Sequence, residues 1–143
     1  MPLADYARRL LHLAETIYQW LGAFAGLERD ARDKVALYAE EIAASLARAA
    51  LALTRLEGNP TDRPSILAAV RELGRISGYL ETIVSALEHH LDGRKLVGVK
   101  RRLETLKPFD LEAVLVEHGA FAHAARLTSA EGFFRALADA LRA

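Results

Sequence analysis

The feature that most constrains this chain is a row of mostly apolar residues at alternating spacings of four and three. Its members are Ile66, Val70, Leu73, Ser77, Leu80, Val84, Leu87 and Leu91. This spacing gathers the side chains on one face of an α-helix, whereas a strand would need a period of two. The segment is therefore predicted to be a long helix that packs lengthwise against other helices.

Two earlier segments carry the same kind of row. The first row is Leu3, Tyr6, Leu10, Leu13, Ile17, Trp20 and Phe24, and the second is Val35, Tyr38, Ile42, Ser45, Ala49, Ala52 and Leu56. The second segment is rich in alanine, which lets a neighbouring backbone approach closely. Since only short connections around Gly26 and Gly58-Asn59-Pro60 separate the three segments, the three long helices are predicted to run antiparallel.

The pattern becomes less regular after Asp92-Gly93. A short helix is expected from about Lys95 to Leu106, ended by Lys107-Pro108, and another from Asp110 to about Arg126. The run Thr128-Ser129-Ala130-Glu131 has the form of a capping box, which predicts the start of a last short helix. The fold expected is an all-α, up-down bundle of three long antiparallel helices with a broken fourth helical section and short C-terminal helices. It forms a single domain over residues 1–143.

Composition excludes several classes of function. The 143 residues include no cysteine, which rules out disulfides, thiolate catalysis and cysteine-ligated zinc. Nineteen basic and nineteen acidic residues cancel, so any electrostatic function has to come from a local patch. No stretch approaches the ~18 consecutive apolar residues of a membrane-spanning helix. A cytoplasmic protein without a membrane partner is expected.

No known catalytic, cofactor-binding or metal-binding motif is found, so the chain is expected not to be an enzyme. Di-iron bundles need Glu-x-x-His, and that sequence does not occur. His12 falls on the polar side of its helix, and His89 and His90 fall at a helix end where a cationic side chain is favourable. His118 and His123 are five residues apart and so face different directions. No cofactor is predicted.

One segment is strongly basic. It contains Arg94, Lys95, Lys100, Arg101, Arg102 and Lys107. As a helix it would bury Leu96, Val99, Leu103 and Leu106 and project its cations on both sides of that stripe. The cations either contact RNA or DNA phosphates or pair with acidic residues on adjacent helices. Because no aromatic residue lies among them, a platform for stacking single-stranded bases is not predicted, and contact with backbone phosphates is the expected mode.

The sequence has more apolar residues than a single row of helix–helix contacts requires. They are Ile76 and Ile83 beside the complete row, and Phe133 and Phe134 near the C-terminus. These residues predict a protein interface, and the leading hypothesis is a non-enzymatic scaffold subunit that forms a homo-oligomer or joins a larger complex. The alternative is that other helices of the same chain cover them. Gly74 and Gly78 also suggest close approach of a neighbouring helix. A third hypothesis is a ligand cavity lined by Trp20 and Tyr38.

The layout of the first hundred residues resembles one bacterial four-helix-bundle family. The similarity lies in Ile17-Tyr18, the short turn to an alanine-rich second helix, and Gly78-Tyr79-Leu80-Glu81-Thr82. That family contains ribosomal-RNA intervening-sequence proteins and the accessory variability proteins of diversity-generating retroelements. The resemblance implies an oligomeric ring of bundles that contacts RNA and a polymerase. Two features depart from it: the neutral net charge and the additional C-terminal helices.

Overall fold

The computed structural model describes residues 3–88, 93–106 and 120–143. Its helices are α1 (Leu3–Gln19), α2 (Leu21–Ala25), α3 (Arg29–Gly58), α4 (Arg63–Ala86), α5 (Gly93–Glu104) and α7 (Ala120–Arg142). No strand occurs among the described residues, so the predicted all-α bundle is confirmed. None of these helices combines the length and the apolar character needed to cross a membrane.

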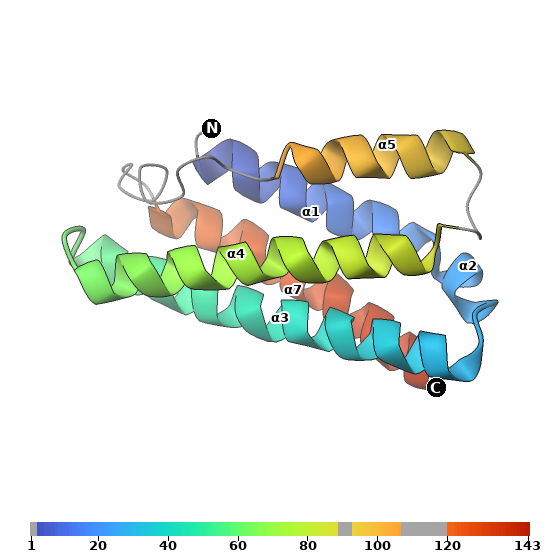
Figure 1. Ribbon diagram of the computed structural model, residues 1–143. Coiled ribbons are helices and arrows are strands. Elements are labelled where there is room, and N and C mark those ends of the chain that lie inside the picture. Colours follow the sequence, from blue (N-terminus) through green and yellow to red (C-terminus); the bar gives the residue numbers. More distant parts are fainter. Residues whose placement is uncertain (1–2, 89–92, 107–119) are drawn as a thin grey trace.

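The four long helices form a bundle in which α7 lies between α1 and α3 (Figure 1). Helix α3 packs extensively against both α4 and α7, and α7 also packs against α1. Helices α1, α4 and α7 run in one direction while α3 and α5 run in the other. Helices α1 and α3 are antiparallel as predicted, but they do not pack extensively on each other. Helix α1 packs mainly on α7, and α3 packs on both α7 and α4. The short helix α5 lies outside this group, against α1 and α4.

The core row of α4 differs in part from the predicted one. Ile66, Leu73, Leu80, Val84 and Leu87 are buried as expected, and Leu91 lies outside the described residues. A column that is not part of the predicted row, Ala69, Ile76 and Ile83, is buried as well. Val70 and Ser77 are only half-buried. Helix α4 packs mainly on α3, and its buried face is wide enough to include the column with Ile76.

The alanine-rich part of α3 allows the close packing that its composition predicts. Ala36, Ala39, Ala43, Ala49 and Ala52 are all buried. Small side chains let α7 and α4 approach on two sides of α3 while larger residues such as Ile42 and Leu46 fill the centre. Dense packing of this kind is what gives a bundle one well-defined arrangement.

The C-terminal part is a single long helix, so the prediction of two short helices divided near Thr128 is wrong. Thr128 lies inside α7, and its hydroxyl donates to the carbonyl of Ala124 at 3.0 Å. A threonine within a helix bonds in this way to the preceding turn, whereas a capping threonine accepts from the following amides. The predicted helix from Asp110 begins outside the described residues.

Gly74 and Gly78 are exposed, and a Cβ atom added at either would meet no neighbouring atom within 4 Å. The expected close approach of another helix is therefore absent among the described residues. Replacing each glycine with alanine is expected to raise the free energy of unfolding by about 0.5–1 kcal/mol, because alanine loses less backbone entropy in a helix. Urea denaturation measures the change.

Gly132→Ala provides the control, since Gly132 is also an exposed glycine with open space inside a different helix, α7. It should gain about the same amount. A loss of stability or a change of oligomeric state confined to Gly74→Ala and Gly78→Ala would contradict the prediction and indicate that another helix covers this face.

Candidate functional site

The basic segment forms helix α5, whose apolar side faces the bundle as predicted. Val99, Leu103 and Leu106 are buried, and Leu96 is half-buried against the same core. The confirmed stripe anchors α5 on α1 and α4, so the orientation of its cations is set by the burial of these four side chains.

The cations of α5 divide into three groups. Lys100 points toward the end of α4, where its Nζ lies 3.3 Å from Glu88 Oε1. Arg94, Lys95 and Arg102 line a groove between α5 and α1. Arg101 is exposed and lines a more open hollow on α5, together with Arg94 and Gly98. Lys107 lies outside the described residues.

The groove between α1 and α5 has two adjoining parts. The first has a volume of about 440 Å³ and is lined by His12, Glu15, Thr16, Gln19, Trp20, Arg94, Lys95, Gly98, Val99 and Arg102. The second, of about 380 Å³, is lined by Arg8, Arg9, His12, Arg102 and Thr105. His12 and Arg102 line both parts, which therefore adjoin each other along the α1–α5 junction. We call the two parts together the α1–α5 groove.

Arg102 is held across this groove by a neutral partner. Its Nη1 donates to Thr16 Oγ1 at 3.1 Å, and Thr16 Oγ1 in turn donates to the carbonyl oxygen of His12 at 2.9 Å. The threonine hydroxyl thus fixes the position of the guanidinium without cancelling its charge. An arginine oriented in this way keeps donors available for an anion.

Positive charge exceeds negative charge in the groove. The cations that line it are Arg8, Arg9, Arg94, Lys95 and Arg102. The only carboxylate among the lining residues is Glu15, although Asp5 pairs with Arg8 nearby at 3.1 Å. Within the described part of the chain, no carboxylate pairs with Arg9 or Arg94. The alternative of pairing within the fold therefore holds for Lys100, whose partner is Glu88.

A second charged cluster, between α3 and α4, is balanced internally. Glu72 is only 7% exposed in its side chain, and its Oε2 lies 3.1 Å from Arg48 Nε and 3.9 Å from Arg75 Nη1. Arg75 also lies 3.8 Å from Glu41, and it donates to the Tyr79 hydroxyl at 3.1 Å. That hydrogen bond raises the pKa of Arg75. Two carboxylates facing two guanidinium groups leave no excess charge for a ligand, so this cluster serves to join α3 to α4.

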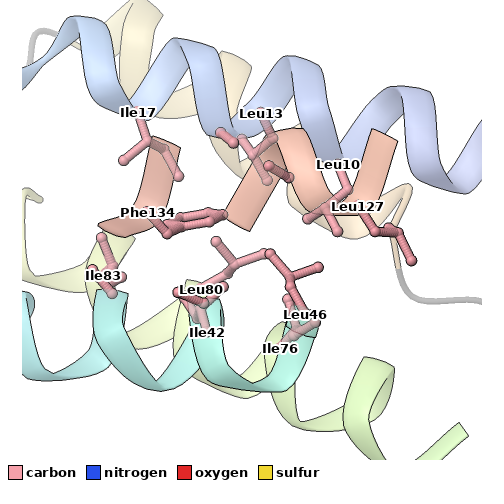
Figure 2. Packing of buried hydrophobic residues seen from close by; sticks show 14 of the residues in the cluster. Leu10, Leu13, Ile17, Ile42, Leu46, Ile76, Leu80, Ile83, Leu127 and Phe134 are labelled. Atoms are coloured by element: carbon pink, nitrogen blue, oxygen red, sulfur yellow. The ribbon is translucent and has the colours of Figure 1, made fainter. Parts of the chain in front are cut away.

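Three of the four predicted interface residues lie in the core. Ile76 and Ile83 are 0% exposed and Phe134 is 1% exposed. Figure 2 shows Phe134 among side chains of α1, α3 and α4. Phe133 is half-buried, with its ring edge-on to Tyr18 at 5.9 Å between centroids. The alternative that other helices of the same chain cover these residues is therefore correct for Ile76, Ile83 and Phe134.

In the described part of the chain Trp20 and Tyr38 line two separate hollows, so the structure does not bring them together as the third hypothesis expects. Trp20 lines the α1–α5 groove, whereas Tyr38 lies between α3 and α4, 5.5 Å from the Tyr79 ring. His12 is exposed as predicted and contributes to the groove. No cluster of three or more potential metal ligands is found in residues 3–88, 93–106 and 120–143. His89, His90 and His118, and the side chain of His123, lie outside the described part.

Sequence reasoning missed the contribution of α1 to the groove. Arg8, Arg9, His12 and Trp20 lie about eighty residues before their neighbours on α5, and no periodicity in either segment indicates that the two helices are adjacent. Comparison with family models, with curated proteins and with solved structures found no match.

Proposed function

We propose that this chain is a non-enzymatic protein that binds nucleic acid by holding the phosphate backbone in the α1–α5 groove. The observation that carries the proposal is the set of five cations, supplied by two helices, against one lining carboxylate. Arginine is the side chain best suited to phosphate, because its planar guanidinium donates two parallel hydrogen bonds to phosphate oxygens. We also propose a cytoplasmic location.

The shape of the site favours a nucleic acid over other anionic partners. Its cations line a recess between two helices, and a flat bilayer surface could not reach into that recess. A strand of phosphates can follow a groove and meet several cations in succession. The resemblance to the intervening-sequence protein family implies RNA contact as well, and that kinship remains a prediction.

A scaffold role through helix–helix contacts is the second candidate. Since Ile76, Ile83 and Phe134 are buried, the observation that now favours it is a set of exposed leucines: Leu37 and Leu51 on α3 and Leu67 on α4, each about half exposed. Light scattering at micromolar concentration tests it, because a strictly monomeric species would exclude a homo-oligomer.

Salt dependence tests the proposed nucleic-acid binding. With fluorescein-labelled RNA and DNA, fluorescence anisotropy should show that log Kobs falls linearly with log salt concentration. The slope is expected near −3, since roughly four phosphates are neutralised and each contributes about −0.7 to −0.9. No binding at low salt, or binding that does not weaken with salt, would overturn the proposal.

A further inference from the structure

The single tryptophan of the chain lies at one end of the α1–α5 groove. Helix α1 ends at Gln19, and Trp20 has a backbone conformation (φ −91°, ψ 18°) that separates α1 from the short helix α2. The indole is partly buried against the core and also lines the groove, beside Gln19, Arg94 and Lys95. A large aromatic surface thus lies next to cations that can bind phosphates.

We propose that the groove binds single-stranded nucleic acid, with one base stacked on the accessible surface of Trp20 and the adjoining phosphates held by Arg94 and Arg102. This inference rests on the proposed function and adds the strandedness of the ligand. Aromatic side chains stack on bases of any identity, because every base has a π-face, and combining such stacking with a cationic groove is a general means of binding single strands.

A duplex does not fit the same arrangement. In a double helix the neighbouring bases in the stack cover the faces of each base. An indole could therefore contact a base face only if the stack opened, which costs free energy. A single strand presents unstacked bases and phosphates together. Gln19 lies at the same end of the groove, and its amide can donate to or accept from the edge of a stacked base.

Gly98 leaves room for the ligand. It lines the groove from the α5 side, has no side chain, and a Cβ atom added there would meet no atom within 4 Å. The volume of about 440 Å³ at this end falls within the roughly 300–1,000 Å³ of pockets that hold small ligands, which is sufficient for a base with its sugar.

Fluorescence of Trp20 provides the direct test, since no other tryptophan contributes to the emission. A ten-nucleotide uridine strand should quench the emission with the same dissociation constant that anisotropy gives for that strand. A duplex of the same length should bind about tenfold more weakly and leave the emission unchanged. Uridine monophosphate should quench only at far higher concentration.

Substitution of Trp20 separates stacking from folding. Trp20→Leu should weaken binding of the single strand about tenfold and leave duplex binding unchanged, while Trp20→Phe should retain most of the single-strand affinity. Because Trp20 also packs on the core, circular dichroism and thermal melting must show that the tested variants are folded. Trp20→Phe keeps an aromatic ring in place, so it remains informative if Trp20→Leu does not fold.

The outcomes distinguish the two proposals. Binding that depends on salt but neither quenches Trp20 nor discriminates against the duplex would overturn the stacking inference and leave the proposed function standing. Quenching by uridine monophosphate at the concentration that suffices for the strand would assign the groove to free nucleotides instead. Absence of salt-dependent binding to any nucleic acid would overturn both.

Discussion

Replacing Arg94 and Arg102 together by glutamate is expected to weaken nucleic-acid binding about a hundredfold or more at physiological salt. Both guanidinium groups line the α1–α5 groove, and no carboxylate in the described part of the chain pairs with either. Each reversal removes a phosphate contact and adds a repulsive charge. The slope of log Kobs against log salt should become shallower by about 1.5, since two contacts are lost. Anisotropy across a salt series measures both effects.

A matched double variant controls for net charge. Arg55→Glu with Arg71→Glu changes the charge by the same amount, but both residues are exposed on α3 and α4 and neither lines the groove. We expect it to bind within about threefold of the unaltered protein, because long-range effects of exposed charges are screened by salt. An equal loss of affinity in the two double variants would mean that binding follows overall charge rather than the groove.

Gly98→Leu tests the location without altering charge. Its side chain would extend into the open space beside Gly98 and occupy part of the groove. A drop in affinity of about tenfold is expected, with the protein at least as stable because leucine favours helix over glycine. Unchanged binding by this variant would place the nucleic acid elsewhere on the surface.

Replacing Phe134 with alanine is expected to lower the free energy of unfolding by about 3–5 kcal/mol. Phe134 is 1% exposed and lies where α7 meets α1, α3 and α4, beside Ile17, Leu80 and Ile83 (Figure 2). Truncation would leave a cavity bounded by all four long helices. Since small domains have total stabilities of about 5–15 kcal/mol, this loss is a large fraction of the whole. Urea denaturation gives the value.

Phe133→Ala is the matched comparison, because the same residue type is removed from the adjacent position on α7. Phe133 is only half-buried and its main ring contact is with Tyr18, so its loss should cost less than half as much. The oligomeric state should be unchanged in both variants. If Phe134→Ala kept full stability but dissociated an oligomer, Phe134 would be an interface residue and the packing of α7 described above would be wrong.

The local patterns predicted much of each helix. On α3, six of the seven predicted row positions are buried, Tyr38 being half-buried. On α5, the predicted stripe anchors the helix on the bundle. These predictions succeed because a helical period determines which face of a segment is apolar, whatever that face later meets.

Local signals failed where long-range packing outweighed them. The capping-box sequence at Thr128 did not start a helix, since α7 packs against α1 and α3 along a continuous length and an interruption would cost those contacts. The excess of apolar residues at Ile76 and Ile83 predicts an external interface, but both residues are buried. The additional apolar residues belong to the wide buried face of α4, which packs mainly on one long neighbour, α3.

The sequence by itself determined the helical class, most of the buried rows and the concentration of cations on α5. Only the tertiary structure decided which helices are neighbours: α7 between α1 and α3, and α5 against α1. That choice brings Arg102 to Thr16 across 86 residues and places Trp20 beside Arg94. The physical reason is that periodicity specifies a buried face but not its partner, and the partner is selected by how the side chains of all the helices pack together.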